Sequence, residues 1–241
     1  MKIQDKVILI TGASGGIGKA AAELLSRRGA RVAVAARSED KIKTLAASLN
    51  DAYAVRVDMT DKASIDIMVK SVLDHYGRID VLINNAGQSV VAPVMEIKID
   101  DFKKIMDLNV YGPLLALQAV VPSMKENGGG MILHIGSMVS KMAIPNLGAY
   151  TATKYATNGL MLTARNELKD SNIIVSVLHP GATATNFGKN AIIGTDKVFT
   201  PTTSADTAEM VAEKIAEAIE HESGEYYMNE ETERMYSPSV A

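Results

Sequence analysis

The sequence lacks cysteine altogether and carries no excess of one charge. The absence of cysteine excludes disulfides, cysteine-ligated zinc and thiol nucleophiles, and it fits the cytoplasmic location that we expect. The 28 acidic and 25 basic residues leave a net charge of only −3. A protein with this balance of charges lacks the excess of positive charge that attracts nucleic acids or anionic membranes, so we expect neither partner.

Long apolar runs are also missing. The first apolar run of the sequence follows Lys6 and ends at Thr11-Gly12. It is too short for the apolar region of a signal peptide. No stretch approaches the roughly 20 apolar residues that span a bilayer, so no membrane segment is expected. What the sequence has is 47% apolar and 22% charged residues, which suits a globular protein with a large core. Its 241 residues, with no linker-like segment, predict one domain.

Short apolar runs alternate with longer segments of helical periodicity. We expect strands over residues 7–10, 31–35, 52–57, 79–83, 131–135, 173–178 and, at an edge, 225–228. We expect helices over 16–28, after Ser38, over 61–75 with Thr60 as the cap, and over 100–125, 148–169 and 203–221. This alternation predicts an α/β fold with right-handed crossovers and a doubly wound parallel sheet covered on both faces. Residues 186–202 lack periodicity and are expected to form a loop or lid over a substrate.

The first expected strand runs into a glycine-rich loop, Thr11-Gly12-Ala13-Ser14-Gly15-Gly16-Ile17-Gly18. Gly12 permits a tight turn, Gly16 allows close approach of a pyrophosphate, and Gly18 allows the helix to pack against the strand. The helix N-terminus then offers free N–H groups to the phosphate, and Ser14 adds a hydroxyl donor. A flexible turn would also be rich in glycine, but the position between a strand and a helix favours dinucleotide binding.

The second expected strand ends in Ala35-Ala36-Arg37. Sites for NAD usually carry an acid here, which holds the ribose 2′-hydroxyl. Arg37 offers instead a charge-assisted contact to a 2′-phosphate, so the sequence favours NADP(H) over NAD(H). The alternative is that Arg37 is a solvated surface residue.

Tyr150 and Lys154 lie four residues apart in an expected helix, which places them on one face. A free tyrosine has a pKa of about 10, too high for efficient proton transfer near neutrality. We expect the ammonium of Lys154 to lower that pKa. The pair alone is common by chance, and on its own a surface pair would be the better interpretation.

Further motifs occur in order along the chain, and together with this pair they resemble the short-chain dehydrogenase/reductase family. The resemblance covers residues 6 to about 185. It is carried by the glycine-rich loop and by Asp58, Asn84-Asn85-Ala86-Gly87, Asn109, Ser137, Tyr150, Lys154 and Pro180-Gly181.

The resemblance implies a Rossmann-type sheet of about seven strands, with the site at the strands' carboxyl ends. It implies that Tyr150 exchanges the proton, that Ser137 hydrogen-bonds the substrate oxygen, and that Asn109 positions a water in the proton path. Lys154 would hold the nicotinamide ribose and Asp58 the adenine. The remaining implied cofactor contacts are Gly12, Ser14, Gly16, Ile17, Gly18, Asn85, Ala86, Gly87, Pro180, Gly181, Thr183 and Thr185.

The expected function is therefore hydride transfer between NADP(H) and a small carbonyl or alcohol substrate, in a homodimer or homotetramer. Two alternatives stay open: a non-catalytic NADP(H)-binding regulator on the same fold, and a sugar-nucleotide epimerase or dehydratase. The four histidines show no metal-binding spacing, and no metal is expected. We expect His134 to be a core residue with satisfied hydrogen bonds, and His179 to pack near the nicotinamide.

Overall fold

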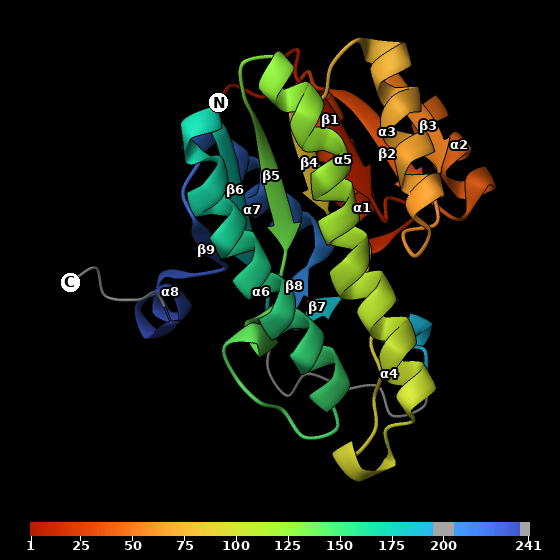
Figure 1. The fold of residues 1–241 in the computed structure, drawn as a ribbon, viewed down its shortest axis with the longest axis vertical. Coiled ribbons are helices and arrows are strands. Elements are labelled where there is room, and N and C mark those ends of the chain that lie inside the picture. Colours follow the sequence, from red (N-terminus) through yellow and green to blue (C-terminus); the bar gives the residue numbers. More distant parts are fainter. Residues whose placement is uncertain (195–204, 237–241) are drawn as a thin grey trace.

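A computed structural model describes residues 1–194 and 205–236 of the chain. Its centre is a seven-stranded sheet in the order β3-β2-β1-β4-β5-β6-β9, in which every neighbouring pair is parallel (Figure 1). The order reverses between β1 and β4, as in dinucleotide-binding folds. The strands of this sheet are β1 (Val7–Thr11), β2 (Arg31–Ala36), β3 (Ala52–Arg56), β4 (Val81–Asn84), β5 (Gly130–Ile135), β6 (Ile173–His179) and β9 (Glu225–Tyr227).

Helices cover both faces of the sheet, and two short strands form a separate pair. The helices are α1 (Gly16–Arg27), α2 (Glu39–Ala47), α3 (Lys62–Tyr76), α4 (Ile99–Met106), α5 (Gly112–Glu126), α6 (Gly148–Leu168), α7 (Ala208–His221) and α8 (Glu230–Tyr236). The parallel pair is β7 (Thr183–Ala184) with β8 (Asp206–Thr207). In Figure 1, this pair and α4 lie at the end of the molecule toward which the arrowhead of β5 points.

The central strands are buried on both faces because each supplies two cores. Ile8 and Ile10 of β1 pack with α1 and α7, whereas Val7 and Leu9 pack with α3, α5 and α6. Alternating side chains of a strand point to opposite faces, so a continuous apolar run is what such a strand requires. The predicted doubly wound α/β fold is confirmed.

The expected helix over 100–125 is not one regular helix. Residues Asp107–Tyr111 form a π-helical segment between α4 and α5. A π turn widens the helix by one residue and is frequent at functional sites, but it leaves no simple signal in apolar periodicity. The prediction missed it for that reason.

Two helix starts also differ from the prediction. Asp61, not Thr60, is the N-cap of α3, and its carboxylate accepts hydrogen bonds from the backbone N–H groups of Ala63 and Ser64. The last long helix begins at Ala208 rather than at 203, because Thr207 adopts extended backbone and caps it through the N–H of Met210. Asp and Thr are both good N-caps, so sequence alone did not decide between the neighbours Thr60 and Asp61.

The continuous helical segment 99–126 is, by length and composition, apolar enough to cross a membrane. The expectation of no such segment rested on counting consecutive apolar residues, and this stretch contains interspersed polar ones. Half of its most apolar 18-residue window is buried inside the protein, where α5 packs against α3 and the sheet. Core helices commonly have this composition.

Candidate functional site

The glycine-rich loop connects β1 to α1 with backbone that favours glycine at two positions. Gly12 has a φ of 69° and Gly16 a φ of 55°, both in the left-handed region. Within the described residues, no side chain caps the N-terminus of α1 at Gly15. Its first N–H groups are therefore available to an anion, and the loop fits the pyrophosphate of a dinucleotide.

The loop after β4 is held against the glycine-rich loop by one threonine that the prediction did not assign. The Thr11 hydroxyl accepts hydrogen bonds from the backbone N–H groups of Asn85 and Ala86, at 3.0 and 3.1 Å. The Asn85 amide in turn donates to the carbonyls of Thr11 and Gly12, at 2.9 and 3.3 Å. Thr11 immediately precedes Gly12, so its position in the motif was the available signal. These bonds place the expected contacts Asn85, Ala86 and Gly87 beside the loop.

Arg37 and Asp58 follow neighbouring strands and face the same region. Arg37 is exposed directly after β2. Hydrogen bonding to Thr60, whose N–H and hydroxyl both donate to the Asp58 carboxylate at 2.9 and 2.7 Å, lowers the pKa of Asp58, and the charge of Arg37 lowers it further. Asp58 therefore already orders the turn before α3.

Asn109 lies within the π-helical segment and is almost completely buried. Its amide donates to the Gln88 carbonyl at 2.8 Å and to the Thr153 hydroxyl at 3.1 Å. Its side-chain oxygen accepts from the Gln88 N–H at 3.0 Å. Asn109 thus joins the loop after β4 to α6, and Gln88 and Thr153 are partners that the prediction did not name.

Ser137, Tyr150 and Lys154 come from two elements that meet at the carboxyl end of β5. Ser137 follows β5 and begins a 3₁₀ turn, where its hydroxyl accepts from the N–H of Val139 at 3.3 Å. Lys154 is buried, and its ammonium donates to the Ile135 carbonyl at 2.8 Å. The same ammonium lies 5.6 Å from the centre of the Tyr150 ring. The four-residue spacing on α6 therefore does place both side chains on one face.

The expected lowering of the Tyr150 pKa is wrong for this structure. Burial raises the pKa of Tyr150 to about 12, and hydrogen bonding to Ser137 only partly opposes that rise. Burial also lowers the pKa of Lys154 to about 8. Desolvation disfavours the charged form of either group, which is the phenolate of Tyr150 and the ammonium of Lys154. Sequence spacing could not reveal this, because it carries no information on burial.

The segment after β6 turns back over the site. The Pro180 carbonyl accepts from the N–H of Met138, at 2.9 Å, beside Ser137. Gly181 follows, and Thr183 begins β7. A Cβ added at Gly16 would lie 3.4 Å from the Thr185 side chain, so this loop approaches the glycine-rich loop. The predicted contacts Pro180, Gly181, Thr183 and Thr185 are thus brought to the same end of the sheet.

The first half of the predicted lid lies against Tyr150. The ring centres of Phe187 and Tyr150 are 5.6 Å apart. Backbone hydrogen bonds join Ile192 to Ser89 and Ile193 to Val91. The remainder of the predicted lid, residues 195–202, lies outside the described residues.

The expectation of a satisfied His134 is wrong. His134 is a buried residue of β5, as expected, but neither of its ring nitrogens has a hydrogen-bond partner among the described residues. Burial and the nearby charges of Lys154 and His179 hold its pKa well below the ordinary value, so the ring is neutral. A neutral imidazole that is buried without hydrogen-bond partners lowers the stability of the fold.

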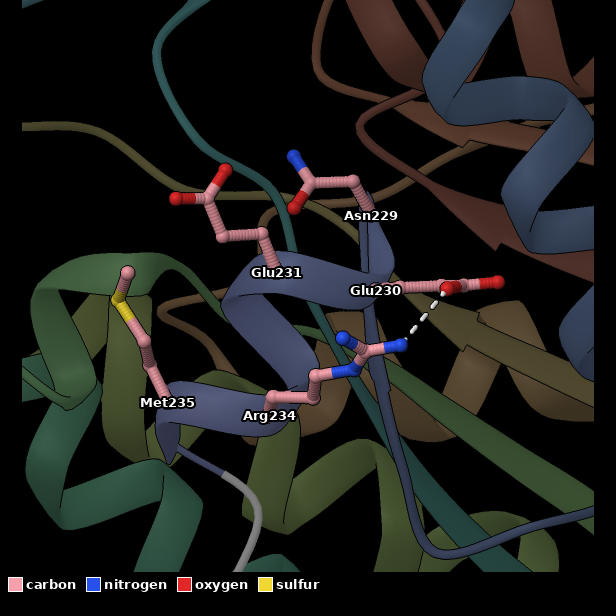
Figure 2. Close-up of a pocket in the computed structure, with 5 residues that line it drawn as sticks. All are labelled: Asn229, Glu230, Glu231, Arg234 and Met235. Carbon is pink, nitrogen blue, oxygen red and sulfur yellow. Dashed lines mark hydrogen bonds and ion pairs between the residues drawn. The ribbon is translucent and has the colours of Figure 1, made fainter.

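A hollow along α8 is not part of this arrangement. Figure 2 shows its five lining residues, in which Arg234 pairs with Glu230 at 3.4 Å. All five are exposed, and none is a predicted site residue: Asn229, Glu230, Glu231, Arg234 and Met235. The convergence of buried polar groups that marks an active site lies instead at the carboxyl ends of the strands.

Known proteins resemble this chain over most of its length. The sequence profile of the short chain dehydrogenase family matches residues 6–194. Dehydrogenase/reductase SDR family member 7B of Xenopus tropicalis is 32% identical over 231 residues, which cover 90% of this chain and 75% of that protein.

Two solved structures have the same fold along nearly the whole chain. One is a 3-ketoacyl-(acyl-carrier-protein) reductase from Brucella melitensis in complex with NADH, with a TM-score of 0.85, 28% identity, and coverage of 93% of this chain and 97% of that one. The other is an alcohol dehydrogenase from the archaeon Thermococcus sibiricus in complex with 5-hydroxy-NADP, with a TM-score of 0.84, 29% identity, and coverage of 93% and 96%.

Proposed function

Because this chain belongs to the short chain dehydrogenase family, and is therefore an oxidoreductase for CH–OH or C=O groups, we propose that it transfers hydride between NADP(H) and a carbonyl or secondary alcohol. The observation that carries the proposal is the meeting of Ser137, Tyr150 and Lys154 at the carboxyl end of β5, beside the glycine-rich loop. When bound, the nicotinamide supplies or accepts the hydride.

The roles of the side chains follow from their charge states. With a pKa of about 12, Tyr150 is protonated at neutral pH and is in the form that donates a proton to a reduced carbonyl. Ser137 stabilises charge on the substrate oxygen by donating its hydroxyl hydrogen. Lys154 holds the nicotinamide ribose, and Asn109 holds a water that returns a proton toward Lys154.

The substrate group beside the reacting oxygen is proposed to be apolar. Phe187 packs against Tyr150, and the core cluster that includes Tyr150 is formed by apolar side chains: Val90, Ile97, Phe102, Ile105, Ala149 and Ile192. An ionised substituent placed there would be desolvated without a partner, at a cost of several kcal/mol.

Replacement of Tyr150 tests the catalytic part of the proposal. Tyr150→Phe removes only the hydroxyl, so we expect turnover with NADPH and a carbonyl panel to fall about 10²–10⁴-fold while NADPH still binds. Tyr53→Phe is the matched control, because Tyr53 lies on the edge strand β3, away from the proposed site and the proposed interface. Full turnover by Tyr150→Phe would refute the role.

Replacement of Arg37 tests the preference for NADP(H). Arg37→Ala should weaken NADPH binding, measured by fluorescence titration, at least ten-fold and leave NADH binding within two-fold, because only NADPH carries the 2′-phosphate. Exposed Arg27 of α1 provides the matched Arg27→Ala control. An equal loss for both cofactors would rule out the contact.

The proposal includes self-association into a dimer or tetramer. It is supported by the exposed apolar side chains of Tyr155 and Leu160 on α6 and of Tyr111 in the π-helical segment before α5. A second copy of the chain that covered these side chains would remove their apolar surface from water. The cytoplasmic location stays a prediction.

A further inference from the structure

Behind the turn that carries Ser137, three elements contribute a buried polar cluster. His179, the last residue of β6, is fully buried, and its two ring nitrogens face different partners. Nε2 lies 2.8 Å from a carboxylate oxygen of Glu225 on β9. Nδ1 lies 3.1 Å from the hydroxyl of Ser140, which is also buried. The cluster therefore links the last strand of the sheet to the turn after β5.

Two neighbours fix the carboxylate and the ring. Lys141 donates to the same oxygen of Glu225 at 2.8 Å. Hydrogen bonding to His179, and then the hydrogen bond and charge of Lys141, lower the pKa of Glu225 to about 2. The Tyr227 ring stacks on the imidazole with 5.0 Å between ring centres. Since the carboxylate is ionised at neutral pH and only accepts, Nε2 of His179 must carry a hydrogen. The ring orientation is thus determined by charge as well as by packing.

From His179 the contacts lead directly to Ser137. The Ser140 hydroxyl donates to the Ser137 carbonyl at 2.8 Å, and Nδ1 of His179 lies 3.4 Å from that same oxygen. The residue before Ser137 is Gly136, where an added Cβ would lie 3.1 Å from Nδ1 of His179. The backbone of this turn can approach the imidazole closely because no side chain intervenes.

A serine, a histidine and a carboxylate in series also describe a nucleophilic triad, but this arrangement does not suit one. The Ser140 oxygen is buried, and it already lies within hydrogen-bond distance of both the Ser137 carbonyl and Nδ1 of His179. A nucleophile needs a site beside it where a reacting carbon can lie. A positioning role remains.

We propose that His179, held by Glu225 and acting through Ser140, is a positioning residue that fixes the Ser137 hydroxyl for the reaction. The inference rests on the proposed function of Ser137. A displacement of about 1 Å at a reacting group is enough to slow catalysis substantially, so the cluster acts on turnover. Its residues lie on β9, β6 and the turn after β5, so the edge strand β9 takes part in building the site.

The test combines kinetics with a double-variant cycle. His179→Gln keeps a donor for Glu225 but not the imidazole, and Ser140→Ala removes a single oxygen from the middle of the path. We expect each variant to lower kcat at least ten-fold with the KM for NADPH within two-fold of wild type. We expect the double variant to be no slower than the slower single variant, because both break one path. His221→Gln, at an exposed histidine, is the control.

The outcomes separate this inference from the proposed function. Single variants within two-fold of wild-type kcat, or losses that multiply in the double variant, would overturn the positioning role. If His179→Gln does not fold, Ser140→Ala alone decides by the same criterion.

If the wild type reduces no carbonyl with NADPH, the proposed function has failed. In that case ¹⁵N NMR of the His179 ring tests whether Glu225, His179 and Ser140 are linked as described. A hydrogen on Nε2 and a ring signal displaced by Ser140→Ala support the linked path. A ring with its only hydrogen on Nδ1, or one unaffected by Ser140→Ala, overturns it.

Discussion

Alanine at Gly18 and alanine at Gly159 are expected to change stability in opposite directions, although both glycines lie in helices. A Cβ on Gly18 would lie 2.5 Å from the Asn85 amide nitrogen and 2.6 Å from the Gly12 carbonyl oxygen. Non-bonded heavy atoms prefer about 3.5–4.0 Å, so roughly 1 Å of overlap must be relieved on both sides. At Gly159, nothing among the described residues lies within 4 Å of the added carbon.

The magnitudes follow from these contacts. Overpacking at Gly18 costs about 1–3 kcal/mol, and displacement of Asn85 from the Thr11 carbonyl costs about 1–3 kcal/mol more. Alanine is a better helix former than glycine, which offsets up to about 1 kcal/mol of this loss. We expect Gly18→Ala to lose about 1–6 kcal/mol of unfolding free energy. Gly159→Ala should gain about 0.5–1 kcal/mol, since alanine has less chain entropy to lose.

Urea unfolding and thermal melts measure both variants beside the wild type. For a protein of this size the expected changes in Tm are a fall of roughly 2–24 °C for Gly18→Ala and a rise of roughly 1–4 °C for Gly159→Ala. Light scattering on each sample ensures that equal assemblies are compared. A Gly18→Ala variant as stable as the wild type would show that the loop and the Asn85 side chain are not packed as described.

Three further predictions concern stability and assembly. The lowered pKa of Glu225 contributes stability above pH 4.5, and this stability is lost as the pH falls toward about 2. In urea titrations at neutral pH, Glu225→Gln should therefore have an unfolding free energy up to about 3 kcal/mol lower than the wild type, and this difference should vanish near pH 2. His134→Leu should raise Tm, because it removes unpartnered buried nitrogens worth about 1–3 kcal/mol; a lower Tm would mean that they are satisfied. Light scattering at micromolar concentration should give the mass of a dimer or tetramer, and a monomer mass would contradict self-association.

The parts of the fold that follow from local pattern were predictable. Apolar runs and glycine positions located the strands, the loop at Gly12 and the start of α1, because periodicity and φ > 0 are properties of short segments. The strand order explains why Asn85 and Ser137, distant in sequence, lie at one end of the sheet. That follows from parallel crossovers, whose handedness is nearly fixed.

What the sequence did not reveal depends on burial and on partners from other elements. The raised pKa of Tyr150 and the empty hydrogen-bonding positions of His134 are set by what surrounds the side chains in three dimensions. The bonds from Asn109 to Gln88 and Thr153 likewise join three separate segments. No short pattern encodes such contacts, since each depends on how whole elements pack.

The π-helical segment Asp107–Tyr111 has a consequence for how this helix tolerates insertions and deletions. The wide turn accommodates one residue more than an α turn does, so removing one residue here would restore regular α winding with α4 and α5 in their present orientations. Ile105 of α4 and Ala116 and Val120 of α5 would then stay in the core. The turn that carries the Asn109 amide would tighten, so the deletion would move that amide away from Gln88 and Thr153. Chain length at these five positions therefore affects the candidate site more than it affects the core.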